Sequence, residues 1–431
     1  MGEADMKVLI ISHNPITTYQ NMGKTLLSLF CAFDKSELCQ LYCYPTIPDI
    51  SVCGSYYRVT DRDVLDSYRH FGRVCSRQIL SHEIDTDRHS IYEREEDAKL
   101  YKKHKKNAAM LLLRDTMWAF AAWYNADLKA WLAKEKPTCI FLAPGESKFI
   151  YEIALRIAKN LGIGIVTYIC DEYYFVERPK GFLSRLQLAL LQKKMKKCLS
   201  QSRKIVTICE ELAVLYREGF GTQTAVIQTG TGFPIADRPR TQEEIRKITY
   251  LGNLSFERFR SIADIGRELD ALNSANGTDY QLEIYSAPLK DHVRELFSDI
   301  ASIRYAGYVT GDAFAEVLQN AQALLHVEAF DQQSKERVKH SVSTKIADCL
   351  GSGAVLLAYG PEEIASMQHL IRNRCAVIAT EREDLKEALA KLLGNTALEP
   401  IVENALSTAG KYHVKKVNSA KLYGILSEAE T

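Results

Sequence analysis

The sequence lacks a long apolar run and a surplus of one charge sign. No stretch reaches the roughly 18 unbroken apolar residues of a membrane span. The nearest, 108–124, is interrupted by Arg114 and Asp115. The 55 Lys and Arg residues nearly balance the 54 Asp and Glu residues. This balance argues against nucleic acid as a partner, because binding to duplex phosphates normally needs a basic face.

Paired cysteine motifs are also missing. The 11 cysteines are an odd number and none are spaced as CxxC, and no His/Cys cluster stands beside the nearest pair, Cys39 and Cys43. We also expect no signal peptide before the strand predicted at Lys7, because only a short polar segment precedes it. We therefore expect reduced cysteines, no metal or cofactor, and a cytoplasmic protein.

Short β-branched runs alternate with longer amphipathic stretches, a pattern typical of parallel strands joined by helices. Strands are predicted in the first half at 7–12, 40–44, 138–143, 164–169, 204–207 and 224–227, and in the second half at 247–251, 281–286, 303–305, 323–327, 354–358 and 376–378. Helices are predicted at 148–161, 262–273, 313–319, 344–350 and 382–393. The pattern predicts an α/β protein with two Rossmann-like, doubly wound domains that face a central cleft, where ligands of such sheets bind.

A chain of 431 residues is too long for one ordinary domain. The segment 230–242 is rich in Gly and Pro and lacks periodicity, which predicts a linker. We therefore expect a first domain at 1–235, joined by a C-terminal helix at 412–431, and a second domain at 236–411. A charged insertion at about 56–136, expected to be mostly helical after Tyr92, gives no direct indication of its function.

The loop after the first predicted strand ends in Gly23-Lys24-Thr25 and leads into an apolar helix. A glycine at a helix start lets backbone N–H groups approach a phosphate. A P-loop ATPase is rejected because position 18 is Thr where that motif requires its first Gly. An ordinary helix N-terminus is the alternative.

In the second half, the strand 247–251 runs into Gly252 and Asn253, and Arg258 follows on the turn. An arginine there can bind two phosphate oxygens at once, so this loop is a candidate diphosphate site. Taken alone, Arg258 is more often a solvated surface residue.

The richest constellation spans 327–353. A strand delivers Glu328 to its carboxyl end, and a polar loop then leads to a helix that opens at Ser341-Val-Ser343-Thr344-Lys345. We expect Ser343 as N-cap, with first-turn donors and Lys345 facing an anion, and Asp348 accepting ribose hydroxyls from the same side. The alternative, a capped amphipathic helix with an apolar core face, is compatible with this role.

At these residues the chain resembles the GT4-type retaining glycosyltransferases of GT-B fold, in particular the branch that synthesises polysaccharides. Gly252, Asn253 and Arg258 take the places of that family's Gly, cation and later Lys or Arg, and Asn253 departs from the usual Arg. His340 and Asp348 take the places of its two Glu residues, so the first half of that signature is broken. Ser341, Thr344 and Lys345 match members whose helix opens with Ser-x-x-Thr-Lys, which implies contact with the donor diphosphate.

The resemblance further implies a nucleoside diphosphate sugar as donor and co-substrate, held without metal, and transfer with retention to a saccharide. Gly23 matches the family's N-terminal glycine loop, and Gly307-Tyr308-Val309 resembles its loop beside the nucleobase. Asp171 and Glu172 stand where members commonly carry a His near the transferred sugar, which makes them candidate catalytic residues. The family reaction is thought to need no dedicated base, because the departing phosphate accepts the proton.

Residues 178–204 form a basic amphipathic helix candidate that carries Arg185, Lys193, Lys194 and Lys197. Such a helix can lie on an anionic membrane surface on the inner face of a membrane, which would favour a polyprenyl-diphosphate-linked acceptor. A domain helix with one solvated face is an equally open alternative.

Two other functions share this fold. One is a GT-B epimerase or phosphorylase that acts on the same donor class. The other is a catalytically weak partner subunit, because Asn253 and His340 interrupt the expected signature.

Overall fold

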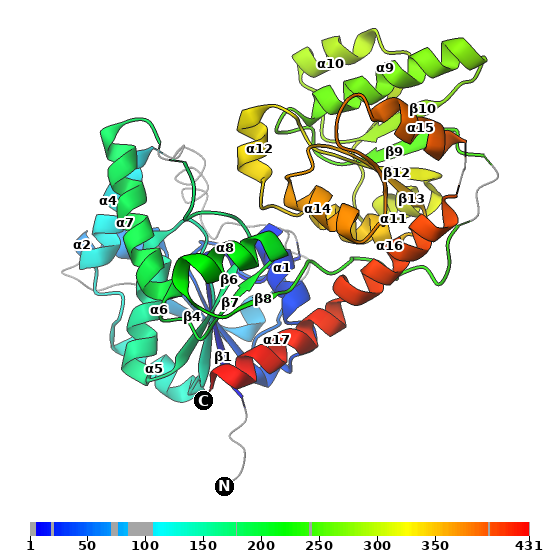
Figure 1. Ribbon diagram of the computed structural model, residues 1–431. Helices are drawn as coiled ribbons and strands as arrows, with labels where there is room; N and C mark the ends of the chain where they lie inside the picture. Colours follow the sequence, from blue (N-terminus) through cyan, green and yellow to red (C-terminus); the bar gives the residue numbers. More distant parts are fainter. Residues whose placement is uncertain are drawn as a thin grey trace. The chain divides into compact units, whose positions relative to one another are not determined.

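A computed structural model describes residues 6–18, 21–69, 76–84, 107–177, 179–240, 244–394 and 397–430. The chain divides into two compact units (Figure 1). Unit 1 comprises residues 1–227 and 415–431, and unit 2 comprises residues 228–414. The division lies eight residues before the boundary expected after residue 235, because 228–240 runs along unit 2: Ala236 and Arg240 donate backbone hydrogen bonds to Gly351 and Gly353.

Unit 1 is built on a sheet of eight strands in the order β4-β3-β2-β1-β5-β6-β7-β8, in which β4 alone is antiparallel to its neighbour. Its strands are β1 (Val8–Ser12), β2 (Leu38–Tyr42), β3 (Ser55–Arg58), β4 (Arg77–Ile79), β5 (Cys139–Ala143), β6 (Gly164–Ile169), β7 (Lys204–Thr207) and β8 (Thr224–Val226). Its helices are α1 (Asn21–Leu29), α2 (Asp61–Arg69), α4 (Ala108–Phe120), α5 (Ala126–Glu135), α6 (Lys148–Leu161), α7 (Phe182–Leu199), α8 (Glu210–Phe220) and α17 (Lys415–Ala429), with short 3-10 turns η1 (Lys35–Glu37) and η2 (Ser81–Glu83).

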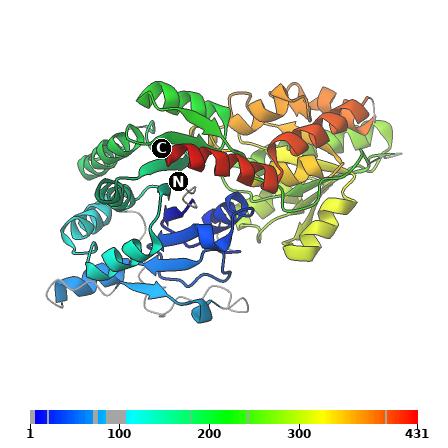
Figure 2. The same cartoon turned by 90° about the horizontal axis from the view of Figure 1, so that it is seen from below.

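The expected C-terminal helix 412–431 corresponds to α17, which packs on α1, β5 and β6 (Figure 2). Leu422 and Leu426 of this helix are fully buried in the core of unit 1, and the backbone N–H of Ala32 donates to the Ser419 hydroxyl at 3.1 Å. The last helix of the chain therefore completes the first unit.

The expected insertion at about 56–136 begins with two strands, β3 and β4, that extend the sheet. Segment 85–106 lies outside the described residues, and the helices expected after Tyr92 are seen as α4 and α5. Two buried tryptophans of this region, Trp118 and Trp131, donate indole hydrogen bonds to Asp61 and Ser55.

Unit 2 is built on a wholly parallel sheet in the order β11-β10-β9-β12-β13-β14. Its strands are β9 (Lys247–Leu251), β10 (Gln281–Tyr285), β11 (Ile303–Gly307), β12 (Ala323–Val327), β13 (Val355–Tyr359) and β14 (Val377–Ala379). Its helices are α9 (Arg258–Asn276), α10 (Asp291–Ser298), α11 (Gly311–Asn320), α12 (Gln332–Val338), α13 (Thr344–Gly351), α14 (Ala365–Arg372), α15 (Leu385–Leu393) and α16 (Glu399–Tyr412).

Helices cover both faces of this second sheet, with α9 and α10 on one side and α16 on the other (Figure 1). If the six strands are numbered as they follow in the chain, their order across the sheet is 3-2-1-4-5-6. This is the strand order of the dinucleotide-binding fold. The expected α/β architecture with two Rossmann-like sheets is therefore confirmed. None of the helices within the described ranges is both long and apolar enough to cross a bilayer.

Candidate functional site

The strand order of unit 2 reverses between β9 and β12, and the carboxyl ends of these neighbouring strands meet at one edge of the sheet. Open parallel sheets bind ligands at such a reversal, because the helices that follow the two strands lie on opposite faces and leave a crevice. Gly252 follows β9, and Glu328 follows β12. These two predicted donor residues therefore lie where the topology favours a ligand.

The loop after β9 needs the glycine at position 252. A Cβ atom there would lie 2.4 Å from the ring of the buried Tyr250, closer than side chains approach. The Tyr250 hydroxyl donates to the Asn253 carbonyl at 2.6 Å, and the Gly252 N–H donates to the Tyr285 carbonyl at 3.0 Å. These contacts fix the backbone of the expected diphosphate loop.

Arg258, the first residue of α9, is neutralised inside the protein. Its guanidinium donates to Glu328 through Nε at 2.9 Å and forms an ion pair through Nη2 at 2.8 Å, and its Nη1 donates to Asn253 Oδ1 at 3.1 Å. Burial raises the pKa of Glu328, while the charge of Arg258 counteracts this rise. The phosphate contact expected for Arg258 stays a prediction, and its ion pair with Glu328 would compete with it.

Two residues before α9 adopt a backbone conformation that side chains disfavour. Phe256 and Glu257 have φ angles of 56° and 54°. The guanidinium groups of Arg258 and Arg337 lie 5.6 Å and 5.4 Å, respectively, from the centroid of the Phe256 ring. A left-handed residue other than Gly costs of order 1–3 kcal/mol, so the surrounding contacts must hold this turn. Neither its conformation nor the contact with Arg337 was indicated by the sequence.

The start of α13 differs from the sequence prediction in one respect. The expected N-cap position of Ser343 is confirmed, although its side chain makes no capping hydrogen bond. The Ile346 N–H donates to the Ser343 carbonyl at 3.1 Å, whereas no acceptor for the N–H groups of Thr344 and Lys345 is found among the described residues. Such N–H groups at a helix start can bind an external anion.

Lys345 lies in the first turn of α13 and is half-buried. Within the described ranges, no hydrogen-bond acceptor or ion-pair partner of its ammonium is found. Burial lowers the pKa of Lys345, and the nearby positive charge of Arg258 lowers it further. A half-buried cation beside an uncapped helix N-terminus favours binding of an anion.

Asp348 faces the chain segment that enters unit 2. Its Oδ1 accepts hydrogen bonds from the Thr231 hydroxyl at 2.9 Å and from the Gly232 backbone N–H at 2.7 Å. This carboxylate therefore holds 231–232 against α13, a role that the sequence did not indicate. Its expected contact with ribose stays a prediction.

The remaining predicted donor residues lie at the same sheet edge or near it. His340 and Ser341 are half-buried between α12 and α13, and Thr344 is exposed at the helix start. Gly307 ends the edge strand β11 with a φ of 95°, which explains why glycine stands there, and the exposed Tyr308 and the half-buried Val309 follow it.

In unit 1, close local packing explains why position 23 is a glycine. A Cβ atom at this position would lie 2.3 Å from the Thr17 hydroxyl and 2.9 Å from the Pro15 carbonyl, so only glycine lets the start of α1 pack against its own loop. This close packing accounts for the glycine without a phosphate. The phosphate contact predicted for Gly23 stays a prediction.

A charged cluster that the sequence did not indicate lies after β1. His13 is 3.0 Å from Arg114 Nη2, and Arg114 forms an ion pair with Asp61 at 2.9 Å. Burial and the neighbouring Arg114 charge lower the pKa of His13 to about 4, while Arg114 lowers the pKa of Asp61 against the opposing effect of burial. The cluster thus joins the β1 loop to α2 and α4 with a neutral histidine.

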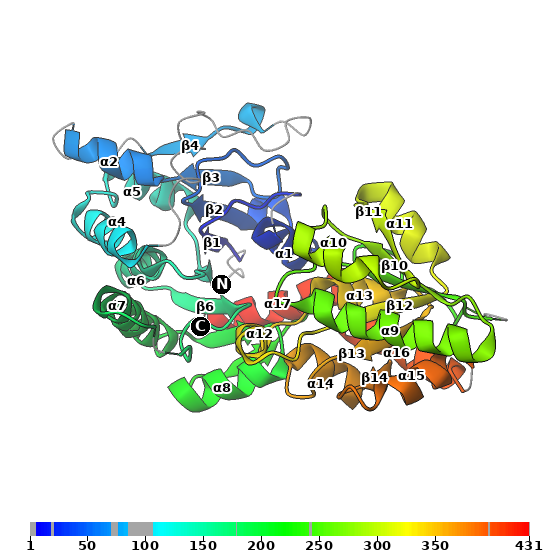
Figure 3. The ribbon, with the colours of Figure 1, turned by 90° about the horizontal axis from the view of Figure 1, so that it is seen from above.

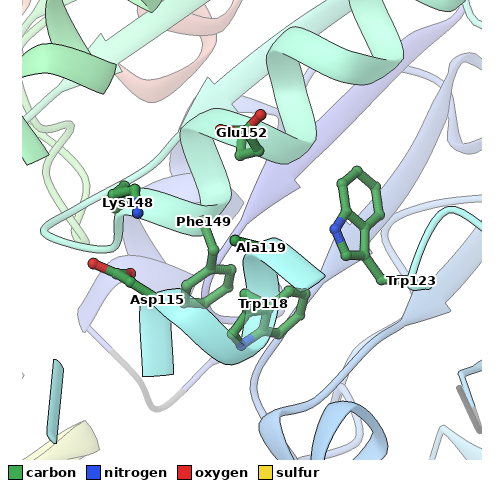
Figure 4. A pocket seen from close by; sticks show the side chains of 7 residues that line it. All are labelled: Asp115, Trp118, Ala119, Trp123, Lys148, Phe149 and Glu152. Carbon is green, nitrogen blue, oxygen red and sulfur yellow. The ribbon is translucent and has the colours of Figure 1, made fainter. Parts of the chain in front are cut away.

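Figure 4 shows a small pocket beside this cluster, between α4 and α6. It is lined by Asp115, Trp118, Ala119, Trp123, Lys148, Phe149 and Glu152. The Trp118 and Phe149 rings stack with centroids 4.1 Å apart. Burial raises the pKa of Asp115, and the positive charges of Lys148 and Arg114 partly oppose this.

The two acidic candidates after β6 are held by their own loop. Glu172 Oε1 accepts from the backbone N–H groups of Tyr174 at 2.6 Å and Phe175 at 2.7 Å, and from the Tyr216 hydroxyl at 3.2 Å. Asp171 accepts from the Tyr173 hydroxyl at 3.1 Å. These contacts make Glu172 a loop-closing residue, and the catalytic roles predicted for both residues stay predictions.

The predicted basic helix is α7. Arg185, Lys193 and Lys197 are exposed on it, whereas Lys194 is half-buried and forms an ion pair with Glu152 of α6. No group of three or more His, Cys, Asp or Glu side chains that could hold a metal ion is found among the described residues.

Compared by sequence, the chain matches no protein-family profile and no curated protein. Its fold is similar to solved structures over nearly the full length. The α,α-trehalose-phosphate synthase of Burkholderia vietnamiensis has a TM-score of 0.59 at 10% identity, covering 98% of this chain and 100% of that chain. HepE of Anabaena, solved in complex with UDP, has a TM-score of 0.62 at 9% identity, with coverage of 98% and 100%. The sucrose-phosphate synthase of Thermosynechococcus elongatus has a TM-score of 0.57 at 11% identity, with coverage of 98% of each chain.

These neighbours are glycosyltransferases of GT-B fold, and the expected GT-B fold is thereby confirmed. Identities near 10% support the fold and leave the specific reaction to be argued from this chain's own residues.

The anion site at α13 predicts a pH-dependent affinity for inorganic pyrophosphate. Because the pKa of Lys345 is lowered from 10.5, its ammonium loses its proton as the pH rises towards that value, and its attraction for the anion is lost with it. At neutral pH the wild-type protein should bind about tenfold to hundredfold more tightly than Lys345→Met, the range for a charged hydrogen bond. Isothermal titration calorimetry should show this ratio falling towards one at alkaline pH. The titration of pyrophosphate itself cancels in the ratio.

Lys386→Met, which removes an exposed lysine of α15, is the matched control and should bind like the wild type at every pH. A wild-type to Lys345→Met ratio that stays constant across the alkaline range would remove Lys345 from the anion site.

Proposed function

We propose that this chain is a glycosyltransferase that moves a sugar from a nucleoside diphosphate sugar to a saccharide or lipid-linked saccharide acceptor in the synthesis of cell-surface polysaccharides or glycoconjugates. The observation that supports this best is the half-buried Lys345 ammonium at the uncapped start of α13. A cation and a helix start at the strand-order reversal of a GT-B fold are features that favour an anion. A solved neighbour of the same fold was determined with UDP, which makes a nucleoside diphosphate the first anion to consider.

In the proposed reaction the bond between the sugar C1 and the diphosphate oxygen breaks while an acceptor hydroxyl oxygen forms a bond to C1. The acceptor proton passes to the departing phosphate, so no dedicated base is required. Negative charge grows on the diphosphate as that bond breaks. Lys345 and the first N–H groups of α13 are fixed before the reaction and stabilise this charge most strongly in the transition state.

The outcome at C1 is proposed to be retention, in line with the resemblance to GT4-type enzymes. For the acceptor we favour a hexose-containing saccharide carried on a polyprenyl diphosphate. In unit 1 such a ligand is expected at the carboxyl edge of the sheet. His13, Lys148 and Asp171 lie at this edge, after β1, β5 and β6 respectively.

A transfer assay tests the proposal directly. Wild-type protein is incubated with each of UDP-, GDP- and ADP-sugars and a panel of saccharide acceptors, and nucleotide release and saccharide products are measured together. Lys345→Ala should reduce turnover by tens to thousands of fold, the scale for a lost transition-state donor. Lys386→Ala should leave turnover unchanged.

Near-normal turnover of Lys345→Ala would exclude Lys345 from the reaction. Conversion of the donor sugar in the absence of any acceptor would favour an epimerase. Donor binding without transfer to any acceptor would favour the non-catalytic partner subunit.

The ribose role of Asp348 has its own test. Asp348→Asn keeps an oxygen that accepts from Thr231 and Gly232, so thermal stability should change little. The charge that would strengthen hydrogen bonds from two ribose hydroxyls is lost, and UDP affinity should fall by roughly tenfold. Unchanged affinity at unchanged stability would assign Asp348 to holding 231–232 alone.

A further inference from the structure

Helices α4 and α7 pack against each other, and both also contact α6. Figure 3 shows the three helices along one side of unit 1, with α6 nearer to the sheet. The surfaces of α4 and α7 that do not pack on α6 carry exposed side chains, among them Phe120 and Phe182. We call these surfaces together the α4–α7 face.

Large apolar side chains are exposed on this face. On α4 they are Met110, Leu113 and Phe120, and on α7 they are Phe182, Leu183 and Leu186. Phe120 and Phe182 are 80% and 78% exposed, which is unusual for phenylalanine. On α4 the three residues recur at helical spacing, and that helix directs its two charged residues, Arg114 and Asp115, inward. Large exposed apolar side chains gathered on two helices that pack together indicate an interaction site.

The charge of the same face has one sign. α7 carries five basic residues and no acidic residue. Arg185, Lys193, Lys196 and Lys197 are exposed, and only Lys194 has an acidic partner on α6. The sole acidic residue of α4 and α7 together is Asp115, which is 7% exposed. The nearest exposed carboxylate in the adjoining loop is Glu177.

The apolar part and the cationic part follow each other along α7. Phe182, Leu183 and Leu186 occupy its first two turns, and the lysines occupy its last two turns. Leu191, farther along the helix, is buried in unit 1. The exposed apolar surface therefore comes from the start of α7 together with α4, a helix that the sequence had not connected with this role.

We infer that the α4–α7 face docks on an anionic lipid surface, with Phe120, Phe182 and their apolar neighbours entering the headgroup region and the α7 lysines contacting lipid phosphates. Apolar side chains that enter the interface and cations that attract acidic headgroups are the two features that such binding requires. A protein partner would need an acidic patch opposite the lysines and an apolar patch opposite the phenylalanines, whereas an anionic bilayer presents both along its whole surface. The inference rests on the proposed function only for the identity of the acceptor, and the docking itself is independent of it.

Co-sedimentation with vesicles tests this inference. The full chain should sediment with vesicles of mixed phosphatidylcholine and phosphatidylglycerol and remain in solution with phosphatidylcholine alone. Lys193→Gln/Lys197→Gln should weaken binding to the mixed vesicles by about 25-fold, since each basic residue near an anionic surface contributes about fivefold. The matched control Lys386→Gln/Lys391→Gln removes two exposed lysines of α15 and should bind as the wild type does.

Phe182→Ser should weaken binding to the same vesicles by roughly tenfold or more, the value of withdrawing a large apolar side chain. Val417→Ser removes an apolar residue of α17 that is 51% exposed and should have no effect. In both Phe182→Ser and the wild type, UDP should raise the melting temperature equally. Loss of that UDP effect in the wild type would count against the proposed function and leave the docking result standing.

Equal recovery of the chain with neutral and anionic vesicles would overturn the inference. So would control variants that weaken vesicle binding as much as the α7 variants do. Sedimentation velocity without lipid tests whether a second copy of the chain, rather than a membrane, covers this face. A wild-type dimer that Phe182→Ser converts to a monomer would show that a second copy of the chain covers the face.

Discussion

The ion pair between Arg258 and Glu328 determines which positive charge unit 2 presents to a ligand. Glu328 is buried directly after β12, and a buried carboxylate without a counter-ion would be strongly unfavourable. Arg258 satisfies it and also contacts Asn253, so one arginine ties the β9 loop to the end of β12. The same arginine lies close enough to Lys345 to lower the pKa of that ammonium further, after the larger effect of burial. An anion placed there would compensate the half-buried Lys345 ammonium for the water that burial removes.

Strand order explains why these residues meet. Glu328 and Arg258 are 70 positions apart in the chain, yet β9 and β12 are adjacent in the sheet and end at the same edge. The helix α13 then brings its positive end to that edge, because it connects β12 to β13 as a right-handed crossover does in parallel sheets. The site thus depends on topology first and on individual side chains second.

Much of this could be predicted from the sequence because buried parallel strands are short, apolar and rich in β-branched residues. The predicted bounds of 164–169, 204–207, 247–251 and 323–327 equal those of β6, β7, β9 and β12. β3 was missed because it is a four-residue strand that ends in the buried Arg58, so no apolar run marks it. The early start of β2 was missed because Leu38 follows directly on the charged turn η1.

Side-chain partners were less predictable than positions. The sequence placed Glu328 at the end of its strand and Asp348 one turn into its helix, but it could not show that Arg258 pairs with the first or that Thr231 and Gly232 bind the second. Such pairings join segments far apart in the chain and depend on the three-dimensional approach of two loops. The same reason hides the joint surface of α4 and α7, since each helix alone resembles an ordinary domain helix.

The central claim is that the start of α13 holds the diphosphate of a nucleotide. A crystal structure of the chain soaked with UDP tests it most directly. The account predicts phosphate oxygens within hydrogen-bond distance of the Lys345 ammonium and of the first N–H groups of α13. A nucleotide bound elsewhere, with the tip of α13 covered by protein atoms, would contradict it.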